Sequence, residues 1–178
     1  PDAGELVDAD RTAARRRGTG LMRMKTVTVY VDADACPVKR EILDVCRLTG
    51  ARAVFVASYD HLMPDDLRGA DVIQVDRGSQ SADLAIANRI GQGDVLVTQD
   101  FGLAALALAR GAAVLNERGR EYRPETIDAL LERRHAAAKA RRGGGRTRGP
   151  AAFTAEDRRA FLQALTKVLR RLQENFSL

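Results

Sequence analysis

Short apolar runs along the chain indicate strands. Five of these runs combine β-branched residues with other apolar side chains. Because such a strand hides both of its faces, we expect each run to lie in a sheet that is covered on both sides. The predicted strands are residues 26–32, 52–58, 70–76, 94–98 and 112–116.

Longer segments with helical signals separate these runs. Pro37, for example, suits the first turn of a helix, and Gly50 suits the residue after its last turn. Alternation of strands and helices predicts βαβ units, and therefore an α/β fold with a mostly parallel sheet of about four to five strands between two layers of helices. The predicted helices are residues 37–50, 79–91, 101–110 and 124–139.

The two ends of the chain differ from this α/β body, which we delimit as residues 24–139. Residues 1–23 show no hydrophobic periodicity, and we predict that they are disordered. Residues 140–178 are interpreted as a basic linker followed by a C-terminal helix. Thr154 and Asp157 have the spacing of a capping box, which favours the start of that helix.

Composition limits the classes of function. The length of 178 residues and the hydrophobic fraction of 45% suit one domain with extensions. No run of about 18 apolar residues occurs, so we expect no membrane segment. Two cysteines rule out a disulfide framework and favour a cytoplasmic protein. With 4% aromatic residues and no Trp, a nucleic-acid reader built on stacked aromatic side chains is disfavoured.

Charge is distributed unevenly between the body and the C-terminal extension. Residues 24–131 contain 12 basic and 16 acidic residues, whereas residues 132–150 contain 7 basic residues and 1 acidic residue. This asymmetry favours a polyanionic partner. A solvated arginine-rich helix without a partner is the simpler interpretation. The oligomeric state stays open, and a homo-oligomer is compatible with the sequence.

Acidic and polar side chains follow the predicted strands. The first strand ends at Asp32, and Asp34 lies two residues further on. The fourth strand ends at Thr98, and Asp100 lies two residues further on. Asp83 lies in the first turn of the helix after the third strand. Because the carboxyl ends of parallel strands meet at one edge of a sheet, we expect these side chains to gather there.

Carboxylates that gather in one place repel one another unless a cation neutralises them. Oxygen ligands suit Mg²⁺ or Mn²⁺, and such an ion activates water and stabilises an in-line displacement at phosphorus. The alternative is that each aspartate only caps a helix or shapes a loop. We predict a catalytic metal site with Thr98 beside it and with the ligands Asp32, Asp34, Asp83 and Asp100.

Several motifs give the sequence a resemblance to a known family. The motifs are VDADACP at 31–37, ADLAIA at 82–87, GDVLVTQDFGLAA at 93–105, LNERGREY at 115–122, and RTRGP at 146–150 followed by DRRAF at 157–161. On these residues the chain resembles the YaiI/YqxD family of small bacterial proteins, over roughly Lys25 to Leu172. That family commonly has Ile-Pro in place of Phe101-Gly102 and TGGP in place of TRGP, and neither difference removes a carboxylate.

The resemblance implies a fold and an activity. The family is similar to PIN-like nuclease domains, in which acidic residues at strand ends hold a divalent metal ion. By position, Asp32 matches the first-strand aspartate, Asp83 the helix acid and Asp100 the aspartate of the T-x-D motif. Asp34 is a fourth candidate, and Thr98 matches the hydroxyl residue of that motif. The resemblance thus implies a three-layer α/β/α PIN-like fold with nuclease activity.

Three functions are compatible with these residues. The first is a metal-dependent phosphodiesterase that cleaves RNA, with single-stranded DNA as the alternative substrate. The second is a non-catalytic RNA-binding module with a vestigial acidic site. The third is a phosphatase of the haloacid-dehalogenase type, since Asp32 and Asp34 have Asp-x-Asp spacing after the first strand. Cys36 at the position where that class has Thr or Val argues against the phosphatase.

Basic residues are the candidates for holding a polyanionic substrate, which a cluster of carboxylates repels. Arg118 and Arg120 follow the fifth strand, near the predicted site, where guanidinium groups suit phosphate. We also expect the α/β body to stay folded when the chain is cut before Arg141. The further candidates, at the end of the body and in the linker after it, are Arg133, Arg134, Lys139, Arg141, Arg142, Arg146 and Arg148.

Overall fold

The computed structural model describes residues 26–59, 67, 69–76, 78, 80–143, 149 and 151–175 of the chain. The disorder predicted for residues 1–23 and the substrate contacts predicted for Arg146 and Arg148 concern positions outside these described residues. No helix in the described part has both the length and the apolar character needed to cross a bilayer.

A six-stranded sheet forms the centre of the described structure, with the strand order β3-β2-β1-β4-β5-β6. All neighbouring strands from β3 to β5 are parallel, and β6 runs antiparallel to β5. The expected mostly parallel sheet is therefore confirmed, with one strand more than predicted. The strands are β1 (Thr28–Asp32), β2 (Arg52–Ser58), β3 (Asp71–Val75), β4 (Val95–Val97), β5 (Ala113–Leu115) and β6 (Glu121–Tyr122).

The sixth strand has no counterpart in the sequence pattern. It contains two residues, Glu121 and Tyr122, and so offers no apolar run from which a strand is predicted. The turn that precedes it closes with a hydrogen bond from the Asn116 amide to the Arg120 carbonyl, 2.9 Å long. Asn116 also accepts hydrogen bonds on its side-chain oxygen from the amides of Arg118 and Arg120. A polar turn therefore folds the chain back along β5.

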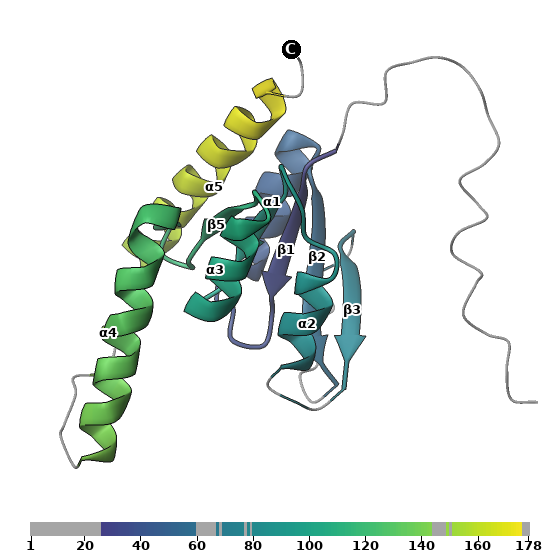
Figure 1. Cartoon of the computed structure of the whole chain (residues 1–178). Helices are drawn as coiled ribbons and strands as arrows, with labels where there is room; N and C mark the ends of the chain where they lie inside the picture. Colours follow the sequence, from purple (N-terminus) through teal and green to yellow (C-terminus); the bar gives the residue numbers. More distant parts are fainter. Residues whose placement is uncertain are drawn as a thin grey trace, which may run out of the picture.

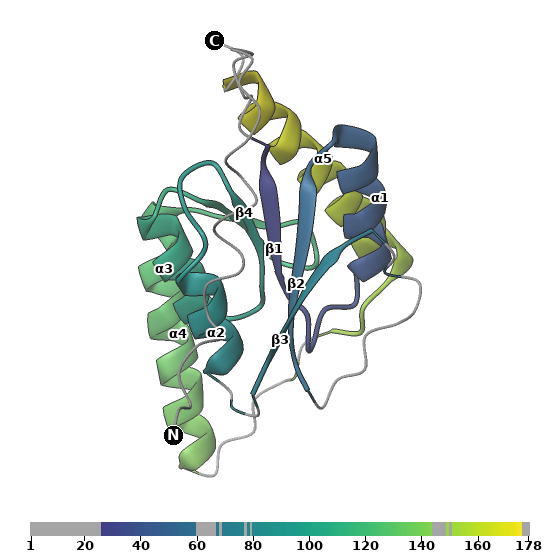
Figure 2. The ribbon, with the colours of Figure 1, turned by 90° about the vertical axis from the view of Figure 1, so that its right-hand side faces the viewer.

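Five helices of the described chain cover the two faces of the sheet (Figures 1 and 2). α1 and α5 pack against each other on one face, and α2, α3 and α4 cover the other face. The predicted three-layer α/β/α arrangement is confirmed. The helices are α1 (Lys39–Thr49), α2 (Ser81–Ala87), α3 (Phe101–Ala109), α4 (Pro124–Arg142) and α5 (Ala155–Asn175).

Alternate side chains of the strands enter two separate cores. Val29 and Val31 of β1 are fully buried against α1 and α5. Val54 and Val56 of β2 are buried on the other face, among residues of α2 and α3. Because both faces are covered at the centre of the sheet, β1 and β2 appear in the sequence as largely apolar runs. The edge strand β3 is instead mostly exposed.

The C-terminal helix α5 belongs to the first of these cores. Phe161, Leu165 and Leu169 follow one another at a spacing of four residues and are fully buried in the core that holds β1. At its start, the amide of Asp157 donates to the hydroxyl of Thr154, while the carboxylate of Asp157 accepts from the amide of Thr154. This reciprocal pair is the predicted capping box.

The packing of α5 corrects one expectation. A cut before Arg141 removes the whole of α5 and exposes the buried side chains that face it, so we no longer expect the α/β body to keep its fold without this segment. The linker also begins later than the sequence predicts, because α4 continues to Arg142. Arg141 and Arg142 are thus exposed residues of the last turn of α4.

The strand order places a topological switch point between β1 and β4. From β1 the chain proceeds to β2 and β3 on one side, and from β4 to β5 on the other. In open α/β sheets a crevice forms beyond the carboxyl ends of the strands at such a point. The residues that follow β1 and β4 are therefore the ones that line it.

We expect Phe161→Ala to lower the free energy of unfolding by about 3–5 kcal/mol, because the substitution leaves a cavity between α5 and the sheet. Urea denaturation followed by circular dichroism measures this change. The control is Arg159→Ala on the same helix, which removes an exposed ion pair with Glu156 and should cost less than about 1 kcal/mol. Equal stability of wild type and Phe161→Ala would show that α5 is not part of the folding unit.

Candidate active site

Asp32 and Thr98 meet at the switch point. Asp32 is the last residue of β1, and Thr98 follows the last residue of β4. The hydroxyl of Thr98 donates to Oδ2 of Asp32 over 3.2 Å, and Thr98 is almost fully buried. The two strands at the centre of the sheet thus deliver a carboxylate and a hydroxyl to one point, as the sequence predicts.

Thr98 also orders the turn that carries Asp100. The hydroxyl oxygen of Thr98 accepts a hydrogen bond from the backbone amide of Asp100 at 3.0 Å. The amide of Thr98 itself donates to the carbonyl of Leu115 in β5. One small side chain therefore fixes the position of Asp32 on one side and of Asp100 on the other.

Asp100 is the N-cap of α3. Its Oδ1 accepts from the backbone amides of Gly102 at 2.7 Å and Leu103 at 2.9 Å. The other oxygen, Oδ2, accepts from Nη1 of Arg134 in α4 at 3.0 Å. Both interpretations of Asp100, as a cap and as a member of an acidic cluster, are thus realised in one residue.

Asp34 and Asp83 lie around the same edge. Oδ1 of Asp34 accepts from the backbone amide of Ser58 at the end of β2, 3.0 Å away. Asp83 lies in the first turn of α2, half-buried. Both contribute to the electrostatics of the switch point, although from different elements.

The carboxylates influence one another's ionisation. Burial raises the pKa of Asp32, and the negative charges of Asp83, Asp34 and Asp100 raise it further, against the hydrogen bond from Thr98. Burial and the charge of Asp100 raise the pKa of Asp83, while Arg134 opposes them. The structure therefore brings the four predicted aspartates together into one interacting cluster.

Asp100 is the exception within this cluster. Partial burial raises its pKa, but the hydrogen bonds from Leu103, Arg134 and Gly102 outweigh that effect and hold the pKa below its usual value. Asp100 is consequently the most firmly ionised of the three carboxylates whose pKa is shifted.

Carboxylates together with a hydroxyl are the donors that Mg²⁺ and Mn²⁺ prefer, so the donor set fits a hard divalent cation. In the arrangement observed, three of the aspartates are engaged with donors of the protein, Thr98, Ser58 and Arg134 among them. Among the described residues, no three side chains of His, Cys, Asp or Glu are placed to hold one ion together. Cation binding would thus require side-chain rearrangement.

Glu117 is a further acid at this edge that the prediction did not select. It follows β5 and lines a small cavity of about 20 Å³ together with Asp32, Cys36 and Thr98. Its Oε2 is buried and has no hydrogen-bond donor among the described residues. Its place after a strand was visible in the sequence, but its burial was not.

Cys36 lines the same cavity but is not a reactive thiolate. Burial raises the pKa of this thiol to about 11, so it is protonated at neutral pH. A structural role for Cys36 at the entry to α1 fits this environment.

The predicted phosphate-binding arginines have different surroundings. Nη1 of Arg118 lies 2.5 Å from the carboxylate of Asp157, and Nη2 donates to the carbonyl of Ala151. The guanidinium also lies over the ring of Phe153. Arg118 therefore secures the segment that leads into α5, whereas Arg120 is exposed.

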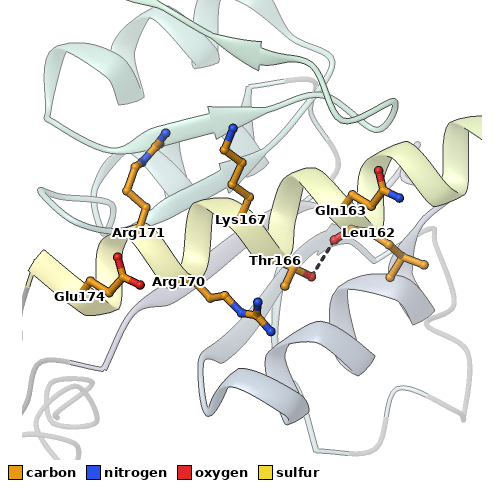
Figure 3. A pocket seen from close by; sticks show the side chains of 7 residues that line it. All are labelled: Leu162, Gln163, Thr166, Lys167, Arg170, Arg171 and Glu174. Carbon is orange, nitrogen blue, oxygen red and sulfur yellow. Dashed lines mark hydrogen bonds between the residues drawn. The ribbon is translucent and has the colours of Figure 1, made fainter.

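A separate hollow of about 660 Å³ runs along α5. Lys167, Arg170 and Arg171 project from the helix around it (Figure 3). None of the four aspartates lines this hollow. Its lining residues are Leu162, Gln163, Thr166, Lys167, Arg170, Arg171 and Glu174.

Comparison with known proteins shows the family of the chain. A family model described as the uncharacterised YaiI/YqxD family matches residues 30–171, which include every described site residue. The chain belongs to the YaiI/YqxD family. The resemblance found in the motifs is thereby confirmed.

Curated relatives of this YaiI/YqxD protein match most of their own length. The UPF0178 protein of Bacillus velezensis is 46% identical over 149 residues, which cover 84% of this chain and 89% of the relative. The UPF0178 protein of Shouchella clausii is 48% identical over 147 residues, covering 82% and 94%. Among solved structures, Rae1 (YacP) from Bacillus subtilis matches with a TM-score of 0.39 and 15% identity, over 85% of this chain and 98% of that chain.

We expect Asp32→Asn to stabilise the metal-free protein at pH 7. A carboxyl whose pKa is raised by folding lowers the free energy of unfolding as pH rises from its ordinary value of 3.8 through the raised folded value. Asparagine removes that charge, so the gain should be present at pH 7 and disappear below about pH 3.8. Urea unfolding in EDTA at both pH values measures it.

Asp128→Asn, at an exposed position of α4, is the matched control and should change stability by less than about 0.5 kcal/mol at either pH. A loss of stability in Asp32→Asn at pH 7 would contradict the repulsion described for this cluster.

Proposed function

We propose that this YaiI/YqxD protein is a metal-dependent phosphodiesterase that cleaves RNA. The observation that supports the proposal most strongly is the mutual repulsion of Asp32, Asp83 and Asp100 around the switch point, which together with burial raises the pKa values of Asp32 and Asp83. A site that concentrates negative charge in this way gains stability from a cation. A bound Mg²⁺ or Mn²⁺ would activate water and stabilise the charge that develops on the phosphodiester.

The residues of the chain have distinct tasks in this proposal. Asp32, Asp83 and Asp100 would hold the ion, with Asp34 as a fourth candidate. Thr98 orients the carboxylate of Asp32 and fixes the turn before Asp100 through its two hydrogen bonds. The amides at the start of α3 keep one oxygen of Asp100 in place.

The RNA part of the proposal depends on the basic end of α4. Arg134 shows that this helix passes the acidic cluster, since its guanidinium contacts Asp100. Arg141 and Arg142 lie two turns further on and are exposed. A single-stranded polyanion bound along α4 would thus meet the cluster, and Arg120 offers an additional exposed cation after β5.

A non-catalytic RNA-binding module is the second candidate. It is favoured by the ion pair between Arg134 and Asp100, which partly neutralises the cluster without a metal.

We place either activity in the cytoplasm, because Cys36 and Cys46 are both free thiols and the cytoplasm keeps thiols reduced.

We expect Asp32→Asn and Asp100→Asn to lower Mn²⁺-dependent cleavage of a fluorescent single-stranded RNA on the order of 100-fold or more, because each removes a charged ligand from the reacting ion. Gel analysis of products over time, with single-stranded DNA as a second substrate, measures the rates. Asp128→Asn should cleave like wild type. Wild type that binds RNA but does not cleave it with Mn²⁺ would favour the non-catalytic module.

We expect replacement of Arg141 and Arg142 by Gln to weaken RNA binding and to flatten its dependence on salt. Each lost phosphate contact should reduce the slope of log affinity against log salt by roughly 0.7 for a single strand. Fluorescence anisotropy across a salt series measures both. The control replaces Lys167 and Arg170, which line the hollow on α5, with the same loss of charge. A larger effect of the control would show that RNA binds along α5 and not along α4.

A further inference from the structure

The acidic cluster already contains a cation of the protein itself. Nη1 of Arg134 lies 3.0 Å from Oδ2 of Asp100, and the side chains of the pair are 52% and 32% exposed. Arg134 belongs to α4, which packs against α3, the helix that Asp100 caps. The positive charge of Arg134 also acts on Asp83, where it opposes the rise of the pKa. The guanidinium therefore lies within electrostatic reach of two of the proposed ligands.

The two oxygens of Asp100 have different freedom. Oδ1 accepts from the amides of Gly102 and Leu103, which belong to the backbone of α3 and stay in place as long as the helix does. Oδ2 accepts from Arg134, whose long side chain can rotate away from it. A divalent cation that binds Asp100 consequently competes with Arg134 and leaves the cap of α3 intact.

The ion pair between Asp100 and Arg134 is weak enough for a divalent cation to displace Arg134. An exposed ion pair of this type contributes an amount equivalent to roughly a two- to fivefold change in a binding constant. A divalent cation shared among several carboxylates also relieves the repulsion between them. The single charge of Arg134 relieves the repulsion between Asp100 and Asp83 only in part. Arg134 thus partly neutralises the cluster in the absence of a metal ion and does not prevent a divalent cation from binding.

A displaced Arg134 stays at the rim of the cluster, because its backbone is fixed in α4. A guanidinium group presents paired N–H donors that match two oxygens of a phosphate, and an arginine at this rim is in position to meet a phosphodiester next to the ion. The same side chain therefore has one partner before cation binding and another after it.

We propose that Arg134 is exchanged between Asp100 and the phosphate of the substrate, so that binding of the divalent cation and binding of RNA reinforce each other. The proposal rests on the proposed function, since it assumes that the ion and the RNA share this site. By linkage, the factor by which the cation tightens RNA binding equals the factor by which RNA tightens cation binding. Arg134 is a substrate-binding residue in this account and makes no bond to the ion.

The first experiment measures Mn²⁺ binding to the full chain by isothermal titration calorimetry. Arg134→Gln should bind Mn²⁺ about two- to fivefold more tightly than wild type, because Asp100 no longer has to release its partner. Arg123→Gln is the matched control, with the same loss of charge at the exposed N-cap of α4, and should shift the affinity less. Arg134→Lys should bind Mn²⁺ nearly as wild type does, because the lysine keeps the charge beside Asp100.

The second experiment measures anisotropy of a fluorescent phosphorothioate RNA with and without saturating Mn²⁺. Mn²⁺ should tighten RNA binding about fivefold or more in wild type and in Arg123→Gln. In Arg134→Gln the tightening should be at least about twofold smaller, because the released guanidinium is missing. Circular dichroism verifies that each variant is folded.

The outcomes separate this inference from the proposed function. Equal Mn²⁺ affinity in Arg134→Gln and Arg123→Gln, with equal tightening of RNA binding, would overturn the exchange and leave Arg134 as a surface ion pair. Absence of Mn²⁺ binding in wild type and in Arg134→Gln, or Mn²⁺ binding that Asp32→Asn does not weaken, would overturn the proposed function and the exchange with it. Mn²⁺ binding that depends on Asp32 and is enhanced by Arg134→Gln supports both.

Discussion

The parallel pairing of β1 with β4 determines where the charged side chains of this protein meet. Val29 pairs with Val95 and Val31 with Val97, so the residues that come directly after Val31 and Val97 lie side by side. Asp32 and Thr98 are those residues, and they are joined by a hydrogen bond. Because the chain turns to opposite sides of the sheet after β1 and β4, the space beyond this pair is the crevice of the switch point.

The acidic cluster is a local destabilising element that the rest of the fold has to offset. Raised pKa values at Asp32 and Asp83 mean that their ionised forms are less favourable in the folded chain than in water. The two cores on either side of the sheet supply the compensating burial, and α5 contributes to one of them through Phe161 and Leu165. A cluster that weakens the folded state in the absence of a partner is characteristic of functional sites.

Most of the fold and the four aspartates were predictable because they depend on local pattern and on the strand-end rule. Apolar runs gave the five parallel strands, and their ends located Asp32 and Asp100 at one edge. What the sequence did not reveal depends on contacts between distant segments. Arg134 reaches Asp100 across 34 positions, and Arg118, expected to bind phosphate, is engaged with Asp157 across 39. The burial of Glu117 likewise arises only when the loops around the switch point are assembled.

A crystal structure of the protein soaked with Mn²⁺ tests the central claim most directly, namely that the cluster at the switch point is a divalent cation site. Anomalous scattering identifies the ion without ambiguity. The account predicts one Mn²⁺ bound to carboxylate oxygens of at least two of Asp32, Asp83 and Asp100, at about 2.2 Å. An ion bound elsewhere, or a cluster that stays free of Mn²⁺ at saturating concentration with Arg134 still on Asp100, would contradict it.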